Sequence, residues 1–309
     1  MAEAAAVEVP VLPDLVLLQV LALLPLRDRL RAARVCRRWQ QLVQDPMVWR
    51  YVDLSPHRLC SHSLWHLVRR HLGDSLRTLR MRGTLCSVSK RRLLSPALLA
   101  ALSKRCPRLH RLSLAETDLR HVPYESIPLS LTVLELSRCE IPTAWFLASA
   151  APRLRHLIVH NTPGFFDHHL LNVSSQNRLK TLSLCGTYRL TDTGIQKAAP
   201  HLEELERLVL RHCSFGDAAI SFIVRHAKHL RFLEMSDTDS LTDVGLACLA
   251  TLQHLQALCL HLCDKISPGA VTALCQALPQ LRNLKLTFEK EEIDKIRAIL
   301  PHCSVSHAP

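Results

Sequence analysis

The chain has 309 residues, 48% of them apolar, and its 39 lysines and arginines outnumber its 27 acidic residues to give a net charge of +12. This apolar content is ample for a large core or an elongated array and excludes disorder along the whole length. Only 8 glycines argue against the glycine-rich phosphate loops of most nucleotide-dependent enzymes, and 5% aromatic residues are sparse for a module that stacks bases. The twelve cysteines form no C-x-x-C pair, which indicates reduced intracellular thiols and not a disulfide framework.

The N-terminus carries Glu3 and Glu8, where a signal peptide has a positively charged region. The apolar stretch 15–26 is interrupted by Gln19 and Pro25 and is too short to span a bilayer. We therefore expect a soluble chain in the cytoplasm, the nucleus or both, with no membrane partner.

Residues 11–50 have the pattern of three short helices. Leu12, Leu15, Leu18, Leu21 and Leu24 recur every three residues, which we interpret as one helical stripe. Pro13 suits a first helical turn, Pro25 ends the helix and Asp28 is a candidate cap for the second. Trp39 and Trp49 lie in or after the third. Helices this short cannot bury a large core alone, so one interpretation is a cap that seals the domain that follows.

From residue 76 onward the chain repeats the pattern L-x-x-L-x-L. The first position of the pattern falls at 76, 109, 131, 154, 179, 205, 230, 255 and 281, and all the intervals after the first are 22 to 26 residues. This period predicts a leucine-rich-repeat solenoid of short parallel strands with helices or loops on the convex side. An extra strand is expected at Val52–Leu54, and the polar stretch 87–92 in the long first interval is expected to form a loop.

The position eight residues after each starting leucine is Thr or Cys in the first eight repeats: Thr84, Thr117, Cys139, Thr162, Thr187, Cys213, Thr238 and Cys263. A small polar side chain at this offset can turn inward and hydrogen-bond the backbone of the neighbouring repeat. The ninth repeat has Glu289, which we interpret as the mark of the last, solvent-facing repeat. Asp192 and Asp243, in the near copies Leu190–Ile195 and Leu241–Leu246, are candidate helix N-caps.

These two patterns resemble a known combination. Residues 12–50 are similar to an F-box in four segments, with departures at Asp14 and at Val20-Leu21: Leu12-Pro13-Asp14-x-x-x-Leu18, Leu24-Pro25-Leu26-x-Asp28-x-Leu30, Val35-Cys36-Arg37-Arg38-Trp39 and Val48-Trp49-Arg50. The repeats resemble the cysteine-containing class of leucine-rich repeats. Together they identify the chain as a member of the F-box and leucine-rich-repeat proteins, with an F-box over residues 8–51 and a repeat domain of about nine to ten repeats over residues 52–309.

The resemblance implies an α/β fold and a non-catalytic function. Members of this family are substrate-recognition subunits of SCF-type ubiquitin ligases, so the expected partners are the SCF adaptor (S-phase kinase-associated protein 1), cullin-1 and a RING subunit reached through it, and a protein substrate marked for degradation. The candidate adaptor-binding residues are the apolar positions of the F-box motif: Leu12, Pro13, Leu15, Leu18, Leu24, Pro25, Leu30 and Val35. Leu24 and Pro25 are the leading candidates among them, and Trp39 is expected to lie in the core.

The strand period predicts the substrate surface. In L-x-x-L-x-L the leucines point inward, so offsets +2, +4 and +6 face the concave side. The charged and histidine residues at these offsets are the candidate substrate-binding residues: Arg80, Arg82, Arg111, Glu135, His156, His160, Arg207, Arg211, Glu234, His261 and Lys285. Six of the eight charged ones are positive, which favours an acidic or phosphorylated substrate, although a net-basic protein exposes arginine on every surface.

Other classes of function fit less well. Cys259-x-His261-x-Cys263 has the look of a metal site, but in the repeat register Cys263 points inward and the other two point outward. We expect no catalytic residue, no metal and no cofactor. The basic runs Arg34–Arg38 and Lys90–Arg92 could attract nucleic acid, but the repeats carry no row of aromatic residues, so we expect no nucleic-acid partner. A leucine-rich-repeat scaffold without a ligase remains the alternative, in which residues 11–50 are only a cap.

Overall fold

A computed structural model describes residues 12–57, 59–85, 93–147, 152–238, 240–263 and 265–307 of the chain. The first helices are α1 (Asp14–Leu23), α2 (Leu26–Ala32) and α3 (Arg37–Gln44), followed by the short 3-10 helix η1 (Pro46–Trp49). The predicted three-helix unit is therefore confirmed. Residues 8–11, with which the predicted F-box begins, and the stretch 87–92, for which a loop was predicted, lie outside the described residues.

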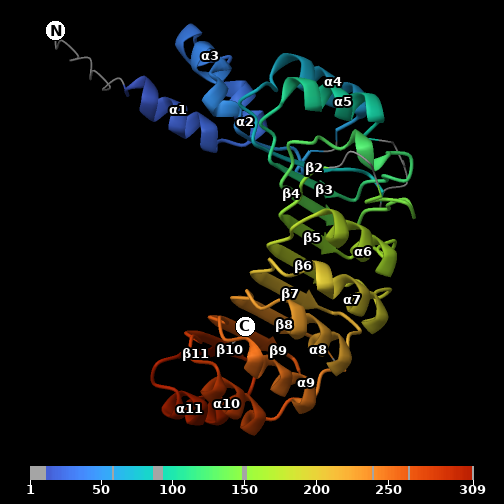
Figure 1. Ribbon diagram of the computed structural model, residues 1–309. Coiled ribbons are helices and arrows are strands. Elements are labelled where there is room, and N and C mark those ends of the chain that lie inside the picture. The colour runs from blue at the N-terminus through green and yellow to red at the C-terminus, as the bar shows by residue number, and fades with distance from the viewer. Residues whose placement is uncertain are drawn as a thin grey trace, which may run out of the picture.

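The rest of the chain builds one parallel sheet whose strands pair in sequence order from β1 to β11. The strands are β1 (Tyr51–Asp53), β2 (Thr78–Arg82), β3 (Arg111–Ala115), β4 (Val133–Ser137), β5 (His156–His160), β6 (Thr181–Cys185), β7 (Arg207–Arg211), β8 (Phe232–Ser236), β9 (Ala257–His261), β10 (Asn283–Leu286) and β11 (Ser304–His307). Figure 1 shows them stacked along an arc, as a solenoid requires. The predicted solenoid and the extra strand near Val52 are confirmed.

Helices and loops return the chain along the outer side of the arc (Figure 1). The α-helices there are α4 (Ser61–Arg70), α5 (Pro96–Arg105), α6 (Asp167–Gln176), α7 (Asp192–Ala198), α8 (Asp217–His226), α9 (Asp243–Cys248), α10 (Pro268–Ala277) and α11 (Lys290–Ile299). The short 3-10 helices η2 (Tyr124–Ser126), η3 (Ala199–His201) and η4 (Leu249–Thr251) complete the returns. The inner face of the sheet is therefore left open to a partner.

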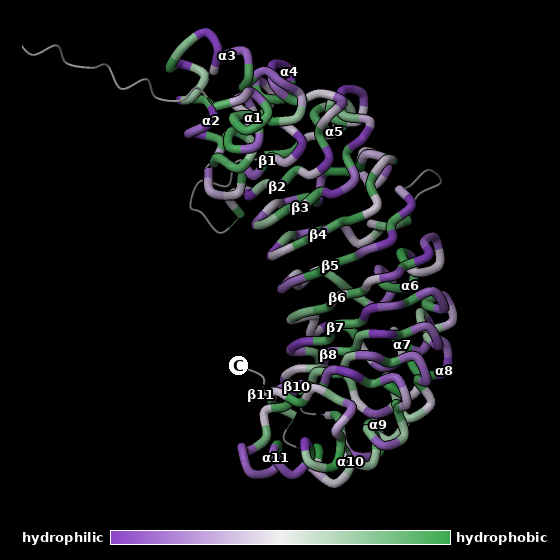
Figure 2. The backbone as a smooth tube through the Cα atoms, turned by 90° about the vertical axis from the view of Figure 1, so that its left-hand side faces the viewer, coloured by the Kyte–Doolittle hydropathy of each residue, from purple (hydrophilic) through white to green (hydrophobic). Residues whose placement is uncertain are grey.

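The repeated leucines form the core between the sheet and the helices. Corresponding leucines such as Leu182, Leu208 and Leu233 pair in register on neighbouring strands and are almost fully buried. Figure 2 shows hydrophobic positions in every strand of the stack, next to the more hydrophilic outer loops. The period of two along each strand therefore sets which side chains face the partner side.

The Thr and Cys residues of this row are buried from Thr117 onward, as predicted. The cysteines make the predicted bond to the backbone of the neighbouring repeat, whereas Thr117 and Thr162 donate to carbonyls of their own repeat. Cys139 donates from its Sγ to the carbonyl of Leu114 in the preceding strand at 3.3 Å. Cys213 contacts the carbonyl of Leu184 at 3.6 Å in the same way. Burial raises the pKa of the Cys139 thiol to about 11, so the thiol keeps the proton it donates.

Four residues predicted to mark the end of a helix or of the repeats do not do so. Thr191 and Thr242 are the N-caps of α7 and α9, and Asp192 and Asp243 are the first residues inside those helices. Asp28 lies inside the first turn of α2, whose N-cap is Pro25. Glu289 does not mark the last repeat, because α11 and strand β11 follow it and β11 pairs with β10.

Trp49 joins the N-terminal helices to the solenoid. Its ring is almost fully buried and stacks on His71, at the end of α4, with ring centroids 4.7 Å apart. The Arg29 guanidinium carbon lies 5.4 Å from the centre of the same ring. This stack of Arg29, Trp49 and His71 gives the two parts of the chain a shared core.

Among the described residues, no helix combines the length and the apolar character needed to cross a membrane. The cysteines that the structure describes are all free thiols.

Candidate functional site

Helix α1 presents a row of apolar side chains to solvent. The exposed residues are Leu12, Leu15, Val16, Val20 and Leu23, and we call them the α1 face. Leu15 is 71% exposed and Leu23 is 86% exposed. Several large apolar residues exposed together on one short helix make an unpartnered surface, which marks a protein-binding site.

The two ends of α1 are held in place by arginines. Arg38 of α3 donates to Asp14 at 2.6 Å and to the carbonyl of Leu12 at 2.6 Å. Arg29 of α2 donates to the carbonyls of Ala22 and Leu24 at 3.0 and 3.1 Å. The α1 face is thus fixed in position by the other helices before any partner binds.

The structure separates the eight predicted adaptor-binding residues into three groups. Leu12, Pro13, Leu15, Pro25 and Val35 are exposed. Leu24 and Leu30 are half-buried and pack against the core. Leu18 is 8% exposed and belongs to the core, together with Leu17 and Leu21, so its assignment as a contact residue is corrected.

The every-third-residue stripe predicted for α1 does not lie on one face. Each step of three residues turns about 300° around a helix of 3.6 residues per turn, so the four steps from Leu12 to Leu24 wind around the axis. This is why Leu18 turns inward while Leu15 turns outward. The prediction missed Val16, Val20 and Leu23, which a period of 3.6 residues places beside Leu15.

All of the predicted substrate-binding residues lie on the strands, in three rows across the open face. Arg111, His156 and Arg207 occupy one row of the strand register, and Arg80, Glu135, Glu234 and Lys285 occupy the next. Arg82, His160, Arg211 and His261 form the third. The register therefore aligns residues that are far apart in the sequence.

Carboxylates form ion pairs with several of the arginines on this face. Arg82 pairs with Glu116 at 2.7 Å, Arg111 pairs with Glu135 at 3.1 Å, and Arg211 pairs with Glu234. Burial of the Glu135 carboxyl acts to raise its pKa, but hydrogen bonds from Ser113 and Arg111 outweigh it and hold that pKa below its usual value. Three of the six positive residues predicted for the open face are thus ion-paired.

The middle of the open face is neutral. Burial, reinforced for His156 by Arg111 and Arg155, lowers the pKa of His156, and burial lowers that of His160. His156 Nδ1 lies 2.9 Å from the hydroxyl of Thr181. The two histidines therefore offer hydrogen bonds without net charge at neutral pH. Ile158 lies between them on the same strand and adds an apolar side chain.

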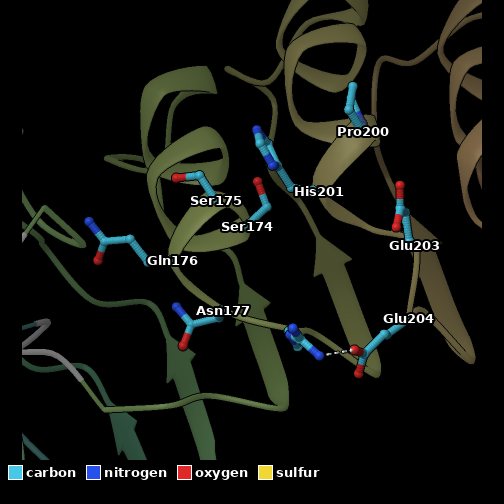
Figure 3. Close-up of a pocket in the computed structure, with 9 residues that line it drawn as sticks. Ser174, Ser175, Gln176, Asn177, Pro200, His201, Glu203 and Glu204 are labelled. Atoms are coloured by element: carbon cyan, nitrogen blue, oxygen red, sulfur yellow. Dashed lines mark hydrogen bonds and ion pairs between the residues drawn. The ribbon is translucent and has the colours of Figure 1, made fainter.

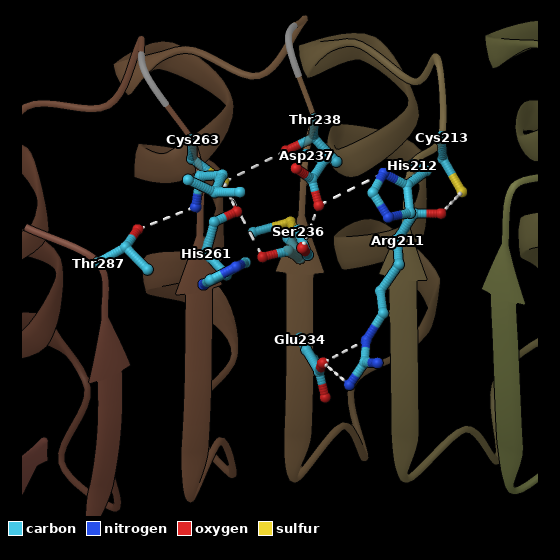
Figure 4. A network of polar contacts seen from close by, with 12 residues as sticks. Arg211, His212, Cys213, Glu234, Ser236, Asp237, Thr238, His261, Cys263 and Thr287 are labelled. Atoms are coloured by element: carbon cyan, nitrogen blue, oxygen red, sulfur yellow. Dashed lines mark hydrogen bonds and ion pairs between the residues drawn. The ribbon is translucent and has the colours of Figure 1, made fainter. Parts of the chain in front are cut away.

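A cavity of about 760 Å³ opens on the face of β7 to β10. Phe232, Ala257 and Cys259 contribute apolar surface to it, and Arg207 lies over the Phe232 ring at 3.5 Å. Figure 4 shows the polar wall, where Arg211 reaches Glu234 and His212 reaches Asp237 at 3.4 Å. Lys285 and His261 also line this cavity, and neither has a side-chain ion pair among the described residues.

A second cavity of about 550 Å³ lies between the end of α1 and the first strands. Leu23, Leu24 and Pro25 line one side, and Arg80 and Arg111 line the other. Two predicted groups that were assigned to different partners, the end of α1 and the start of the open face, therefore meet at one site.

A row of residues with a left-handed backbone conformation was not predicted from the sequence. The residue just before each inward Thr or Cys has a positive φ in seven repeats: Glu116, Arg138, Asn161, Gly186, His212, Asp237 and Leu262. Each N–H of the row turns toward the next repeat; that of Glu116, for example, donates to the carbonyl of Ser137 at 2.8 Å. The signal was present in Gly186, Asn161 and Asp237, residue types that tolerate this conformation.

The Cys259-x-His261-x-Cys263 pattern does not form a metal site. Cys263 is buried and contacts the hydroxyl of Thr238 at 3.4 Å, whereas Cys259 and His261 lie on the open face. Within the described ranges there is no group of three or more His, Cys, Asp or Glu side chains able to hold a metal ion.

Comparisons with known proteins agree with these two parts of the molecule. A model described as F-box-like matches residues 9–55, and a model described as leucine rich repeat matches residues 226–250. F-box/LRR-repeat protein 12 of Homo sapiens is 39% identical over 307 residues, which cover 95% of this chain and 94% of the relative, and the Mus musculus protein of the same name is 38% identical. A crystal structure of Rad7 and Elc1 from yeast shares the fold with a TM-score of 0.50 at 18% identity, covering 82% of this chain and 73% of that one. The matches confirm the resemblance that the two sequence patterns indicated.

Proposed function

The chain belongs to the F-box/LRR-repeat proteins, and from this membership we propose that it is the substrate-recognition subunit of an SCF-type ubiquitin ligase. In this proposal the N-terminal helices dock on the SCF adaptor, which connects the chain to cullin-1 and a RING subunit. The open face of the solenoid captures a protein substrate for ubiquitination and degradation. The assembly acts in the cytoplasm, the nucleus or both.

The proposed chemistry is proximity. The chain performs no bond-making step; it raises the effective concentration of substrate lysines near an activated thioester carried by another subunit. This task needs two binding surfaces held at a fixed distance, and the shared core of Trp49 and His71 supports it by joining the helices rigidly to the solenoid.

The observation that carries the proposal is the α1 face. Leu15 and Leu23 are the most exposed of its leucines, and the ends of α1 are pinned by Arg38 and Arg29. An apolar helix face held in this way is suited to a hydrophobic groove on a partner. Val16 and Val20 now join the predicted contacts, and Leu18 leaves them.

For the substrate, we propose that the cavity on β7 to β10 is the main capture site. Its apolar surface at Phe232 and Ala257 suits a large apolar side chain, and Lys285 suits an acidic residue next to it. An uninterrupted acidic or phosphorylated stretch finds less support, because Glu116, Glu135 and Glu234 already neutralise arginines along this face.

The test is co-purification of the full chain with the SCF adaptor, comparing wild type with a Leu15→Asp, Leu23→Asp double variant. The control is a Leu129→Asp, Val244→Asp double variant, which changes two apolar residues of similar exposure on the solenoid. We expect wild type and the control to form a one-to-one complex and the α1 variant to remain folded but unbound.

The proposal fails if the wild type does not bind the adaptor, or if both double variants bind it equally well. In the first case the N-terminal helices are only a cap, and the solenoid is a free-standing binding scaffold. In the second case the adaptor docks elsewhere on the chain.

A further inference from the structure

The net charge of the protein is confined to one part of the chain. Residues 54–115 contain 13 of the 39 lysines and arginines but only one of the 27 acidic residues, Asp74. The other residues of the chain therefore have no net charge. Like charges gathered in this way repel one another and work against folding, so such a concentration indicates a function.

Some of these cations are neutralised by the next repeats. Arg82 and Arg111 face the open side of the sheet, where Glu116 and Glu135 pair with them. Arg80, on the same face, is exposed and has no carboxylate within ion-pair distance among the described residues. The open face of these repeats therefore displays only a small part of the excess charge.

The excess is displayed at the edge of the solenoid where the strands begin and the helices end. Six cations lie there, and we call them the basic edge: Arg69, Arg70, Arg77, Lys104, Arg105 and Arg108. All except the half-buried Arg77 are exposed. None of the six has a carboxylate within ion-pair distance among the residues that the structure describes.

The basic edge is one continuous surface. Arg105, at the end of α5, donates to the carbonyl of Arg69, at the end of α4, at 2.9 Å. Arg77 Nη1 lies 3.5 Å from His110 Nε2 at the starts of the neighbouring strands. A tight turn, in which Leu109 N donates to the Cys106 carbonyl at 3.1 Å, carries the chain from the end of α5 to β3.

Helix-end electrostatics account for only part of this surface. Cations in the last turn of α4 and α5 interact favourably with the negative ends of the helix dipoles. Arg77 stands just before β2, seven residues beyond the last residue of α4, so the helix dipole does not account for it. Its placement next to the helix-end cations calls for an external anion.

We infer that the basic edge docks an acidic polypeptide segment of a partner protein. This goes beyond the proposed function, because none of the six residues belongs to the α1 face or to the open face. Arginine guanidinium groups form paired hydrogen bonds with carboxylates. A short run of Asp or Glu residues crossing two repeats would meet all six cations.

The same edge argues against a long nucleic acid. Four strands further on, about 19 Å away, the edge becomes acidic. Figure 3 shows Glu203 and Glu204 at this point, beside a cavity of about 430 Å³ that His201 also lines. Arg178 is already paired with Glu204 at 3.1 Å. A duplex following the edge would be repelled there, whereas a short acidic segment would not reach it.

The test uses the full chain and a fluorescein-labelled peptide of ten glutamates, with binding followed by fluorescence anisotropy at rising salt. The variant is Arg70→Glu, Lys104→Glu, Arg108→Glu. The control is Lys228→Glu, Arg231→Glu, Arg282→Glu, which makes the same change in net charge at exposed positions on the same edge of later repeats. We expect the variant to weaken binding about tenfold or more and the control to weaken it by less than threefold, because interactions between exposed charges are screened over about 10 Å.

Equal weakening by both triple variants would overturn the inference, because binding would then follow net charge alone. A 12-base-pair DNA duplex is the second probe. Tighter binding of the duplex than of the peptide, with the same dependence on the three substituted residues, would assign the basic edge to nucleic acid and also overturn it. Neither outcome changes the result expected for adaptor binding, because that test depends on different residues.

Discussion

The carboxylate of Asp217 in one repeat accepts two hydrogen bonds from Thr242 in the next, from the backbone N–H at 2.8 Å and from the hydroxyl at 2.6 Å. Asp167 binds Thr191 in the same way, and Asp243 binds Ser267. An aspartate in the first turn of each helix from α6 to α9 therefore holds the N-cap of the following helix. This ladder runs on the helix side of the solenoid, parallel to the Thr and Cys ladder beneath the strands.

The aspartate ladder explains why residue 245 is a glycine. A Cβ added to Gly245 would lie 2.3 Å from the Asp217 carboxylate. We expect Gly245→Ala to lower the free energy of unfolding by about 1–3 kcal/mol, because the overlap outweighs the better helix propensity of alanine. Urea unfolding followed by circular dichroism measures this change.

The control for that substitution is Gly269→Ala in the first turn of α10, where an added Cβ meets nothing within 4 Å. It should raise stability by about 0.4–1 kcal/mol. If the two substitutions have the same effect, the close approach of Asp217 is not what requires the glycine.

The inward ladder predicts a difference between two substitutions of Cys139. Cys139→Ala removes the bond to the Leu114 carbonyl and should cost about 1–3 kcal/mol, since that buried acceptor loses a partner. Cys139→Thr keeps a donor, as other repeats do, and should cost less. Equal losses in urea unfolding would show that packing volume, and not the hydrogen bond, matters at this position.

The burial of His169 predicts acid sensitivity. Burial lowers its pKa from 6.5 to about 4; its Nδ1 accepts from the N–H of Phe166 at 3.0 Å and its Nε2 lies 2.9 Å from the Pro142 carbonyl. Because the unfolded chain takes up the proton first, stability is intact above about pH 6.5 and falls as the pH drops toward 4, by about 3 kcal/mol in all.

His169→Gln should flatten this pH dependence between pH 7 and pH 4.5, while His254→Gln, at an exposed position, should preserve it. The measurement is the free energy of unfolding in urea at several pH values. A wild-type stability that is constant over this range would contradict the assignment.

The direction of the side chains along each strand predicts opposite outcomes for neighbouring positions. Leu258 is 1% exposed, and Leu258→Ala should cost about 2–5 kcal/mol through the cavity it leaves. Lys285 is exposed, and Lys285→Ala should change stability by less than about 0.5 kcal/mol. Similar losses, measured by thermal unfolding, would mean that the two faces of the sheet are wrongly assigned.

Local periodicity was sufficient to predict the solenoid and the face on which each strand residue lies. The spacing of leucines separates inward from outward positions, so the order of residues alone places Arg80 and Lys285 on the open face. The same reasoning failed for α1, where a three-residue stripe suggested that Leu18 and Leu15 share a face. A helix completes a turn in 3.6 residues, and small errors in period accumulate along it.

The sequence by itself determined the family, the repeat register and the concentration of charge in residues 54–115, because these depend only on residue order. The tertiary structure decided which charges are paired. Arg111 meets Glu135 only because β3 and β4 lie side by side, although 24 residues separate the two in the chain. Arg70 and Arg108 have no carboxylate within ion-pair distance in the described structure, because the acidic residues Glu203 and Glu204 lie several strands further along that edge. Pairing depends on distances across the sheet, and the linear order of residues does not contain those distances.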